Sequence, residues 1–503
     1  MVPTVRSAIM IGVYELAVLL DREDEVLTSL TFAALLIAIV WPGVIADISF
    51  QLSFVAVFFI AWGMRRIYGC FPAQPKAQLP QEQSRLKPRL RQIGFQLAVP
   101  LLGTIGTGPL IAHYFGHLSL AGFLSNPVIV PLVGFIVVPL GLLTGFLSLI
   151  LPQAASVLVW LTEWPLSLTV WLVAAFSHLP LAHIGVPAPN AVEVTVLYIF
   201  VLSLVMARES RYALLATIVA TLFLVADGSF WWRERWARKE LRVTHLNVGN
   251  GDAALVELPG SKVLLIDAGG RAIGDFDTGE GIVAPFLRTR KILGIDYLFV
   301  SHPRIDHYGG MRSILNEFAA KEFWSGTARG RTERFNDLEE TLEKTKIKRV
   351  KLSSADPCRF IDAVKFCVLF APHNGAEDTS VVLRLEFGNV AFLFAGDIDK
   401  RDERFLRARG EELRSTVLKV PRHGSASANS PDFIAMVHPR VAVFSMAAPG
   451  ARGRGTDEVA AGYRHVGAEI LRTYEDGAII LETDGSTIRY QGYKSGKRGK
   501  IVL

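Results

Sequence analysis

The pattern of hydrophobic and polar positions divides the chain into two parts. Before residue 230, runs of about 20 apolar residues recur, which is enough for a helix to cross the roughly 30 Å hydrocarbon core of a bilayer. From Leu241 onward, charges of both signs return and the apolar runs shorten to the length of strands. The pattern predicts a membrane domain over residues 1–230, a basic juxtamembrane linker over 231–240 and a globular domain over 241–503.

The first part contains stretches that predict membrane spans, with boundaries loose by several residues. They cover 7–20, 26–44, 48–63, 94–113, 118–148, 154–177, 190–206 and 211–228. The stretch 118–148 is long and rich in proline, so it is either a broken or re-entrant helix or a helix with a simple proline kink. Gln51, Ser53 and Asn126 put polar groups at membrane depth, where they either line a channel or hydrogen-bond between helices.

Basic loops predict the orientation of these spans. The segment 64–92 carries seven lysines and arginines against the single acid Glu82, which predicts a cytoplasmic location. The short link from Arg208 to Arg211 has the same character, so the last span runs outward and the C-terminal domain lies outside the cytoplasm. Four basic residues after that span argue for the opposite orientation or contact anionic headgroups or a polyanion: Arg233, Arg235, Arg238 and Lys239.

The second part predicts two sheets covered by helices. Three short strand patterns joined by glycine-rich turns occupy 241–270, and an amphipathic helix pattern near 279–291 precedes a buried strand at 295–300. A helix is expected from near Gly310. Further strand patterns at 364–370, 380–386, 390–395, 415–420 and 440–445, with helices between some of them, complete an α/β domain.

Composition and charge change this picture little. A net charge of +6 and a pI near 9.1 suit a protein that handles a polyanion, but much of the excess lies in the loop after Met64. Three cysteines exclude a disulfide-rich scaffold. Cys358 and Cys367 flank a possible hairpin, and they either pair in an oxidising compartment or remain two buried thiols.

Candidate metal ligands follow the ends of predicted strands. His302, Asp306 and His307 lie in the loop after the strand at 295–300, Asp397 ends a second apolar strand and His423 ends a third. Imidazole and carboxylate together suit Zn²⁺, Mn²⁺ or iron. A lone histidine is usually a surface or core residue, and Gly-Asp is a common turn. Three separate strand–loop junctions carry these residues in order, however, which argues against coincidence.

These junctions carry a resemblance to a known fold and family. The soluble part resembles the metallo-β-lactamase fold, whose signature loop reads H-x-[HD]-x-D-H. The motifs "LNVGNGDAALVE", "LLIDAGG", "SHPRIDHYGG", "FAGDI" and "LKVPRHGS" resemble the C-terminal domain of the ComEC family of competence proteins. The motifs "VPTVRSAIM", "ISFQLSFVAV" and "SNPVIVPLVGFIVVPLGLL" resemble that family's channel region.

The resemblance implies a multi-pass α-helical membrane domain followed by an α/β metallo-β-lactamase-like αββα sandwich. It also implies uptake of transforming DNA as a single strand through an inner-membrane channel, with the C-terminal domain periplasmic or otherwise extracytoplasmic. The implied partners are single-stranded DNA, the lipid bilayer, other competence proteins and, for a channel, further copies of the chain. The family usually has more chain at the N-terminus, so a shortened chain is expected.

The site departs from the family pattern at two arginines. Arg304 stands in place of an acid or histidine in the signature loop, and Arg422 replaces a histidine before His423. In the two-ion form of the fold this leaves only His302 from the loop for the first ion. The second ion keeps Asp306, His307, Asp397 and His423, so one Zn or Mn ion is favoured over two, with Asp306 and Asp397 as the catalytic carboxylates.

Several functions fit these residues. In the first, one ion activates water while Arg304, Arg422, Lys419 and Ser425 bind the DNA phosphodiester, which makes the domain a metal-dependent phosphodiesterase. In the second, the domain guides DNA through sequence-independent phosphate contacts without cutting it. A relic domain packed against the channel, and a membrane-anchored hydrolase of a small ester or lactone, are the remaining alternatives. About eight spans favour a conduit over an anchor.

Overall fold

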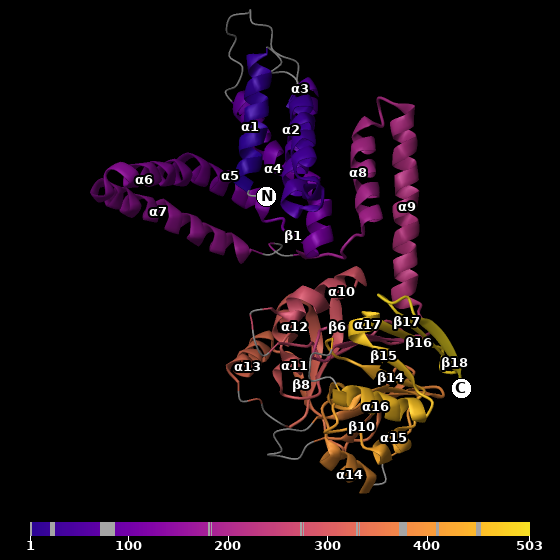
Figure 1. Cartoon of the computed structure of the whole chain (residues 1–503). Helices are drawn as coiled ribbons and strands as arrows, with labels where there is room; N and C mark the ends of the chain where they lie inside the picture. Colours follow the sequence, from indigo (N-terminus) through magenta and orange to yellow (C-terminus); the bar gives the residue numbers. More distant parts are fainter. Residues whose placement is uncertain are drawn as a thin grey trace, which may run out of the picture. The chain divides into compact units, whose positions relative to one another are not determined.

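The computed structural model describes two compact units. It covers residues 3–20, 26–70, 86–179, 182, 184–271, 274, 276–327, 330, 332–371, 380–408, 412–448 and 454–503. The units are Met1–Thr221 and Leu222–Leu503, and the boundary falls within the long helix α9 (Arg211–Trp236) (Figure 1).

The N-terminal unit consists almost entirely of helices, as expected (Figure 1). They are α1 (Pro3–Leu19), α2 (Val26–Val40), α3 (Ile48–Cys70), α4 (Leu86–Phe115), α5 (Gly122–Leu132), α6 (Val138–Ile150), α7 (Pro152–Ser177), α8 (Ala191–Met206) and the start of α9. Four stretches in the described residues are long and apolar enough to cross a membrane: Ile48–Ile67, Gly122–Ile150, Ala155–Ser177 and Arg211–Trp236. These helices confirm a multi-pass membrane domain, while the count of eight spans and their orientation stay predictions.

The proline-rich stretch forms one continuous helical run from Gly122 to Ile150. A π-helical turn, η2 (Val133–Val137), joins α5 to α6 between Pro131 and Pro139. Proline removes a backbone donor and crowds the preceding turn, and a wider turn accommodates both effects. The structure therefore excludes a break or re-entrant loop within these residues.

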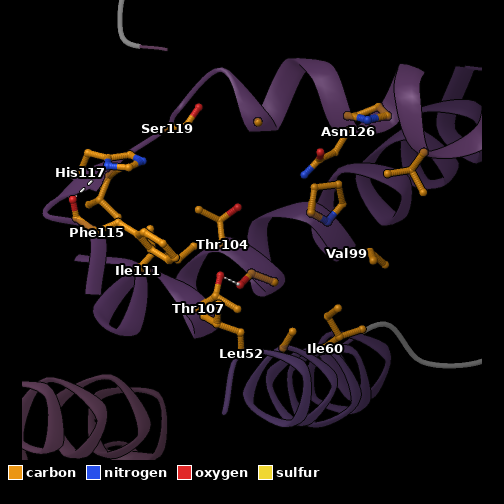
Figure 2. Close-up of a pocket in the computed structure, with 18 of the residues that line it drawn as sticks. Leu52, Ile60, Val99, Thr104, Thr107, Ile111, Phe115, His117, Ser119 and Asn126 are labelled. Atoms are coloured by element: carbon orange, nitrogen blue, oxygen red, sulfur yellow. Dashed lines mark hydrogen bonds between the residues drawn. The ribbon is translucent and has the colours of Figure 1, made fainter. Parts of the chain in front are cut away.

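Polar residues at membrane depth have different surroundings. Gln51 accepts a hydrogen bond from the Tyr114 hydroxyl at 3.0 Å, and the Ser53 hydroxyl donates to the Ser49 carbonyl at 2.7 Å. Asn126, in contrast, lines a cavity of about 830 Å³ between α3, α4 and α5, and Figure 2 shows its amide directed into that space. Of the three predicted channel-lining residues, only Asn126 borders this cavity. The predicted basic loop falls largely on residues 71–85, outside the described residues.

The C-terminal unit contains two sheets. The nine-stranded sheet has the order β18 (Arg498–Val502), β17 (Thr487–Gly492), β16 (Ile479–Thr483), β3 (Leu241–His245), β4 (Ala254–Glu257), β5 (Val263–Ile266), β6 (Gly294–Val300), β7 (Ala319–Ser325) and β8 (Lys348–Lys351). The seven-stranded sheet has the order β15 (Glu469–Arg472), β14 (Val441–Phe444), β13 (Val417–Lys419), β12 (Val390–Phe394), β11 (Val382–Phe387), β10 (Val364–Phe370) and β9 (Arg359–Ile361).

Buried apolar side chains hold four layers together. Val243, Phe299 and Phe392 belong to a cluster in which both sheets meet. A second cluster joins the nine-stranded sheet to α10 (Ala284–Thr289), α12 (Met311–Glu317) and α13 (Glu333–Thr345). A third joins the other sheet to α14 (Lys400–Ala408), α15 (Pro431–Val437) and α16 (Arg454–His465), so helices lie outside each sheet (Figure 1). The predicted αββα sandwich is confirmed.

The two cysteines of the C-terminal unit form a disulfide. Antiparallel pairing of β9 with β10 sets Val364 opposite Ile361, and continuing this register sets Cys367 opposite Cys358. Their Cα atoms are 4.4 Å apart, the separation of a directly opposed, non-hydrogen-bonded pair in such a ladder. Of the two states that the sequence allows, the structure has the paired one.

Candidate metal centre

Loops at one edge of the two sheets bring acids and histidines together. Asp252 lies in the β3–β4 loop, His307 in the short helix α11 (Ile305–Tyr308) after β6, Asp397 after β12 and His423 in the turn η4 (Pro421–Gly424) after β13. Their potential ligand atoms all lie within 4.8 Å of one another. Strand ends fix the backbone rigidly, so side chains distant in sequence converge on one point.

Asp267 orients the ring of His307. Its carboxylate accepts from the Ser301 N–H at 2.8 Å and the Ser301 hydroxyl at 2.6 Å, and the His307 Nδ1–H donates to Oδ2 at 3.0 Å. All three residues are buried. Because Nδ1 is occupied as a donor, Nε2 carries the lone pair, which is the usual arrangement behind a metal-binding histidine.

His423 is oriented by a backbone carbonyl. Arg422 and His423 have left-handed backbones, with φ of 49° and 53°, in the turn after β13. This turn lets the His423 Nδ1–H donate to the Ser445 carbonyl at 2.8 Å, and Ser445 itself is fixed by its hydroxyl donating to the Gly251 carbonyl at 2.7 Å. In its neutral form His423 therefore also presents the Nε2 lone pair to an ion.

The two Nε2 atoms face the same carboxylates. From Asp397 Oδ1, the Nε2 of His307 is 3.5 Å away and that of His423 is 3.8 Å away, while His423 Nε2 is 3.9 Å from Asp306 Oδ2. Both Nε2 atoms are buried and have no hydrogen-bond partner. The same holds for the Oδ1 atoms of Asp306 and Asp397. Buried polar atoms are nearly always satisfied. The two Nε2 atoms and Asp397 Oδ1 converge on one point, with the Asp306 carboxylate beside His423, and such a set of nitrogen and oxygen ligands fits a divalent ion.

Glycines allow the loops to approach this closely. Gly270 has a φ of +150°, and a Cβ added there would lie 1.8 Å from the Ile305 carbonyl oxygen. Gly396 has a φ of +56°, and its Cβ would lie 2.6 Å from the Ser380 side chain, whose hydroxyl accepts from the Asp397 N–H at 2.7 Å. These two positions hold α11 and Asp397 at the centre.

The charges at the centre perturb each other's protonation. Burial opposes ionisation of Asp397, but hydrogen bonding to His307 and the nearby positive charges hold the pKa of its carboxyl well below the usual range. Burial also lowers the pKa of His423, but Asp252 and Asp306 outweigh it and raise that pKa to about 9. The carboxylates thus create a strongly cation-attracting pocket, in which protons and a divalent ion compete for the imidazoles.

Arg304 reaches the same carboxylates from the solvent side. Its guanidinium lies 3.3 Å from Asp306 Oδ2 and 3.3 Å from Asp397 Oδ2, and its side chain is 47% exposed. His302, the one loop residue predicted to remain for a first ion, is buried with its ring 5.6 Å from that of His307. The fixed positive charge of Arg304 thus lies beside Asp306 and Asp397, at the position where a second ion would need a ligand.

The predicted phosphate-binding residues divide into two groups. Lys419 is only 4% exposed and its ammonium pairs with the buried Asp252, so the structure does not support a phosphate contact there. Arg422 and Ser425, in contrast, are partly exposed beside His423. No described residue hydrogen-bonds the Arg422 Nε. Of the four predicted phosphate-binding residues, the structure leaves Arg304, Arg422 and Ser425 available to a phosphate.

Asp252 and Asp267 were not recognised as site residues from the sequence. Asp252 approaches both imidazoles from the Nδ1 side, at 3.7 Å from His307 and 3.4 Å from His423, opposite the Nε2 atoms. We therefore assign it, like Asp267, to orienting and charge-balancing the histidines. Both aspartates follow a glycine-rich turn or a strand end, as Asp397 does, and that criterion would have found them.

Each of the two parts of the chain matches a known protein family. Residues 1–211 match the model of the competence protein family, and residues 246–447 match that of the metallo-beta-lactamase superfamily. ComE operon protein 3 of Bacillus subtilis is 24% identical over 97% of this chain and 61% of its own length. Competence protein ComA of Neisseria gonorrhoeae is 26% identical over 74% of this chain and 49% of its own. The chain thus spans about half to three fifths of these relatives.

Solved structures align with the C-terminal unit at low similarity. The metallo beta lactamase from Hirschia baltica aligns with a TM-score of 0.24 at 15% identity, covering 46% of this chain and 95% of that one. CmlA, a diiron beta-hydroxylase from Streptomyces venezuelae, aligns with a TM-score of 0.32 at 10% identity, covering 52% and 54%.

Proposed function

We propose that this chain, in which a competence-protein domain precedes a metallo-β-lactamase domain, is a membrane component of DNA uptake whose C-terminal domain binds one divalent ion and acts on DNA phosphodiesters. The observation that carries the proposal is the convergence of buried, unsatisfied ligand atoms on His307, His423 and Asp397, with the Asp306 carboxylate 3.9 Å from His423 Nε2. The multi-pass helical domain supports a transport role for the whole chain.

The residues of the centre divide the work between holding an ion and holding the substrate. His307, His423, Asp397 and Asp306 would hold the ion. A bound ion would polarise a phosphoryl oxygen and lower the pKa of a bound water to about 7. Burial tends to raise the pKa of Asp306, but hydrogen bonding to His423 lowers it below its usual value, so Asp306 suits a ligand better than a proton acceptor.

Arg304 and Arg422 would bind the phosphodiester. Arg304 is half exposed at the rim, and its guanidinium can present two parallel N–H groups to phosphate oxygens. It already lies between Asp306 and Asp397, so a phosphate bound there would stand directly beside the ion. The fixed charge would stabilise the negative charge that develops on the phosphoryl oxygens in the transition state.

A second function is favoured by the same arginine. The Arg304 guanidinium pairs with two carboxylates of the centre, and this pairing neutralises charge that would otherwise attract the ion. If that pairing persists, the domain guides DNA through phosphate contacts without cutting it. Both functions place the C-terminal domain outside the cytoplasm. The Cys358–Cys367 disulfide supports this location because such bonds persist in oxidising compartments.

The test uses the purified full chain in detergent. Metal content after incubation with Zn²⁺ or Mn²⁺, and binding and cleavage of a single-stranded oligonucleotide, are measured for the wild type, Asp397→Asn and the control Asp337→Asn on the exposed face of α13. A one-metal phosphodiesterase binds one ion and cleaves, and only Asp397→Asn abolishes both. Metal-free protein that binds DNA supports the guiding function, and a chain that binds neither refutes both.

A further inference from the structure

A second cavity lies on the outer face of the nine-stranded sheet. It has a volume of about 610 Å³ and is formed by β3, β16, β17, β18 and α10. Residues alternate between the faces of a strand, so Arg489 and Gln491 of β17 and Arg498 and Lys500 of β18 lie along this side, while Ile488 and Ile501 pack on the core. We call this cavity the basic groove.

The basic groove holds more positive than negative charge. Its one acidic lining residue, Glu482, is shared between Arg242 and Arg489, at 2.5 Å and 3.4 Å. In the part of the chain that the structure describes, no acidic side chain pairs with Arg498 or Lys500.

The register of the edge strands places like charges side by side. Arg489 is directly opposite Lys500 across β17 and β18, and such a pair is destabilising unless an anion lies between the charges. Arg489 is already paired with Glu240 at 2.6 Å and with Glu482, so the exposed Lys500 and its neighbour Arg498 are the cations left to bind an anion. The basic groove is therefore suited to a phosphate-bearing ligand.

The end of α9 is fixed beside the basic groove. Its Glu234 pairs with Arg242 at 3.0 Å and with Arg290 at 3.3 Å, and both arginines line the groove. The ring of Trp231 lies 5.8 Å from the Arg290 guanidinium. These contacts all lie within the C-terminal unit, so the helix end and the groove form one surface.

The same helix end has the character of a membrane interface. α9 is long and apolar enough to cross a bilayer, and its last turns expose Phe230, Trp232 and Trp236 at 59%, 61% and 60%. Aromatic residues in this position lie at the level of lipid headgroups. Since Trp231 contacts Arg290, the basic groove opens within reach of those headgroups.

We propose that the basic groove binds the headgroup of an anionic phospholipid in the leaflet where α9 ends. Arg498 and Lys500 contact the phosphodiester beside the glutamate-paired Arg489, and Phe286 and Ile480 provide an apolar floor for the glycerol and the first methylenes of the acyl chains. Single-stranded nucleic acid fits less well, because the Tyr490 ring packs on the core and Phe286 is the one other aromatic residue of the lining, whereas successive bases stack on several rings. The lipid thus fixes the C-terminal domain at the membrane surface.

The test measures binding of a fluorescent short-chain phosphatidylglycerol to the full chain in neutral detergent. Short-chain phosphatidylcholine and a ten-residue oligothymidylate serve as comparison ligands. We expect phosphatidylglycerol to bind at least about 10-fold more tightly than phosphatidylcholine, since each basic residue near an anionic surface contributes about 1 kcal/mol, or about fivefold. The double variant Arg498→Gln/Lys500→Gln should weaken that binding about 30-fold.

Two further variants control for charge and folding. Arg401→Gln/Arg407→Gln on α14 removes the same charge elsewhere in the domain and should leave binding unchanged. Glu482→Gln removes the one acid of the groove and should tighten binding several-fold, a gain that misfolding does not produce. The proposal is overturned by equal binding of both lipids, by an equal loss in the α14 variant, or by oligothymidylate that binds in the groove where phosphatidylglycerol does not. Metal content of the centre is independent of each outcome.

Discussion

Replacing Arg304 with histidine is expected to raise the number of bound ions from one to two. The Arg304 guanidinium lies 3.3 Å from Asp306 and 3.3 Å from Asp397, on the side of the centre where His302 also lies in the loop. Histidine removes the fixed charge and supplies a neutral nitrogen. Together with His302 and the two carboxylates, it would complete a ligand set for a second ion.

The magnitude follows from the charges that are removed. Two unit charges about 4 Å apart interact by about 4 kcal/mol at an effective dielectric constant near 20. The Arg304 side chain is 47% exposed, so solvent reduces each of its ion pairs to about 1 kcal/mol at most. Without ions, the variant should therefore unfold with a free energy about 1–2 kcal/mol lower. With ions, the loss of a competing cation should tighten binding of the first ion about 10-fold.

Ion stoichiometry by mass spectrometry and affinity by calorimetry check this prediction on the full chain. Arg304→Gln is the matched control, because it removes the charge without adding a ligand and should bind one ion more tightly than the wild type. If Arg304→His holds a single ion with unchanged affinity, Arg304 does not compete for the two carboxylates and the argument fails. Weaker binding in Arg304→Gln would contradict it in the same way.

The remaining predictions concern the residues behind the centre and the edge of the second sheet. Asp267→Asn should weaken metal binding about 10- to 100-fold, because His307 loses the acceptor that orients it, and competition with a chelator measures this. Burial, assisted by Lys419 and opposed by Asp252, lowers the pKa of His245 from 6.5 to about 4. The unfolded chain therefore binds a proton that the folded chain does not, so about 3 kcal/mol of stability is lost as the pH falls from 6.5 to 4. Denaturant titrations at several pH values should show a smaller loss in His245→Leu. Cys358→Ser opens a loop closed over a separation of 9 residues and should lower the free energy of unfolding by about 2–3 kcal/mol, which reductant should reproduce only in the wild type.

Period-two alternation and strand-end positions carried most of what could be predicted. The strand expected at 364–370 forms at Val364–Phe370. His307, Asp397 and His423 converge because β6 of one sheet and β12 and β13 of the other end at the same side of the sandwich. The local sequence pattern gave a wrong prediction where tertiary packing determines the surroundings of a side chain. Lys419 precedes His423 by four residues and suggested a phosphate contact, but β13 lies in the middle of its sheet and encloses the side chain against Asp252. Only the fold brings these two residues together.

The rigidity of the centre is distributed unevenly, and this limits what a single substitution can change. The imidazole of His307 is buried and that of His423 is partly buried. Asp267 and the Ser445 carbonyl hold them at Nδ1, so their Nε2 atoms cannot turn away. Arg304 is half exposed and held only by the carboxylates it shares with the ion. Moving Arg304 onto a phosphate costs little, since the ion replaces its charge at the carboxylates. Metal binding and phosphate binding should therefore strengthen each other. Arg304, which interrupts the ligand pattern, couples the two, because it leaves the carboxylates when the ion binds and then pairs with the phosphate.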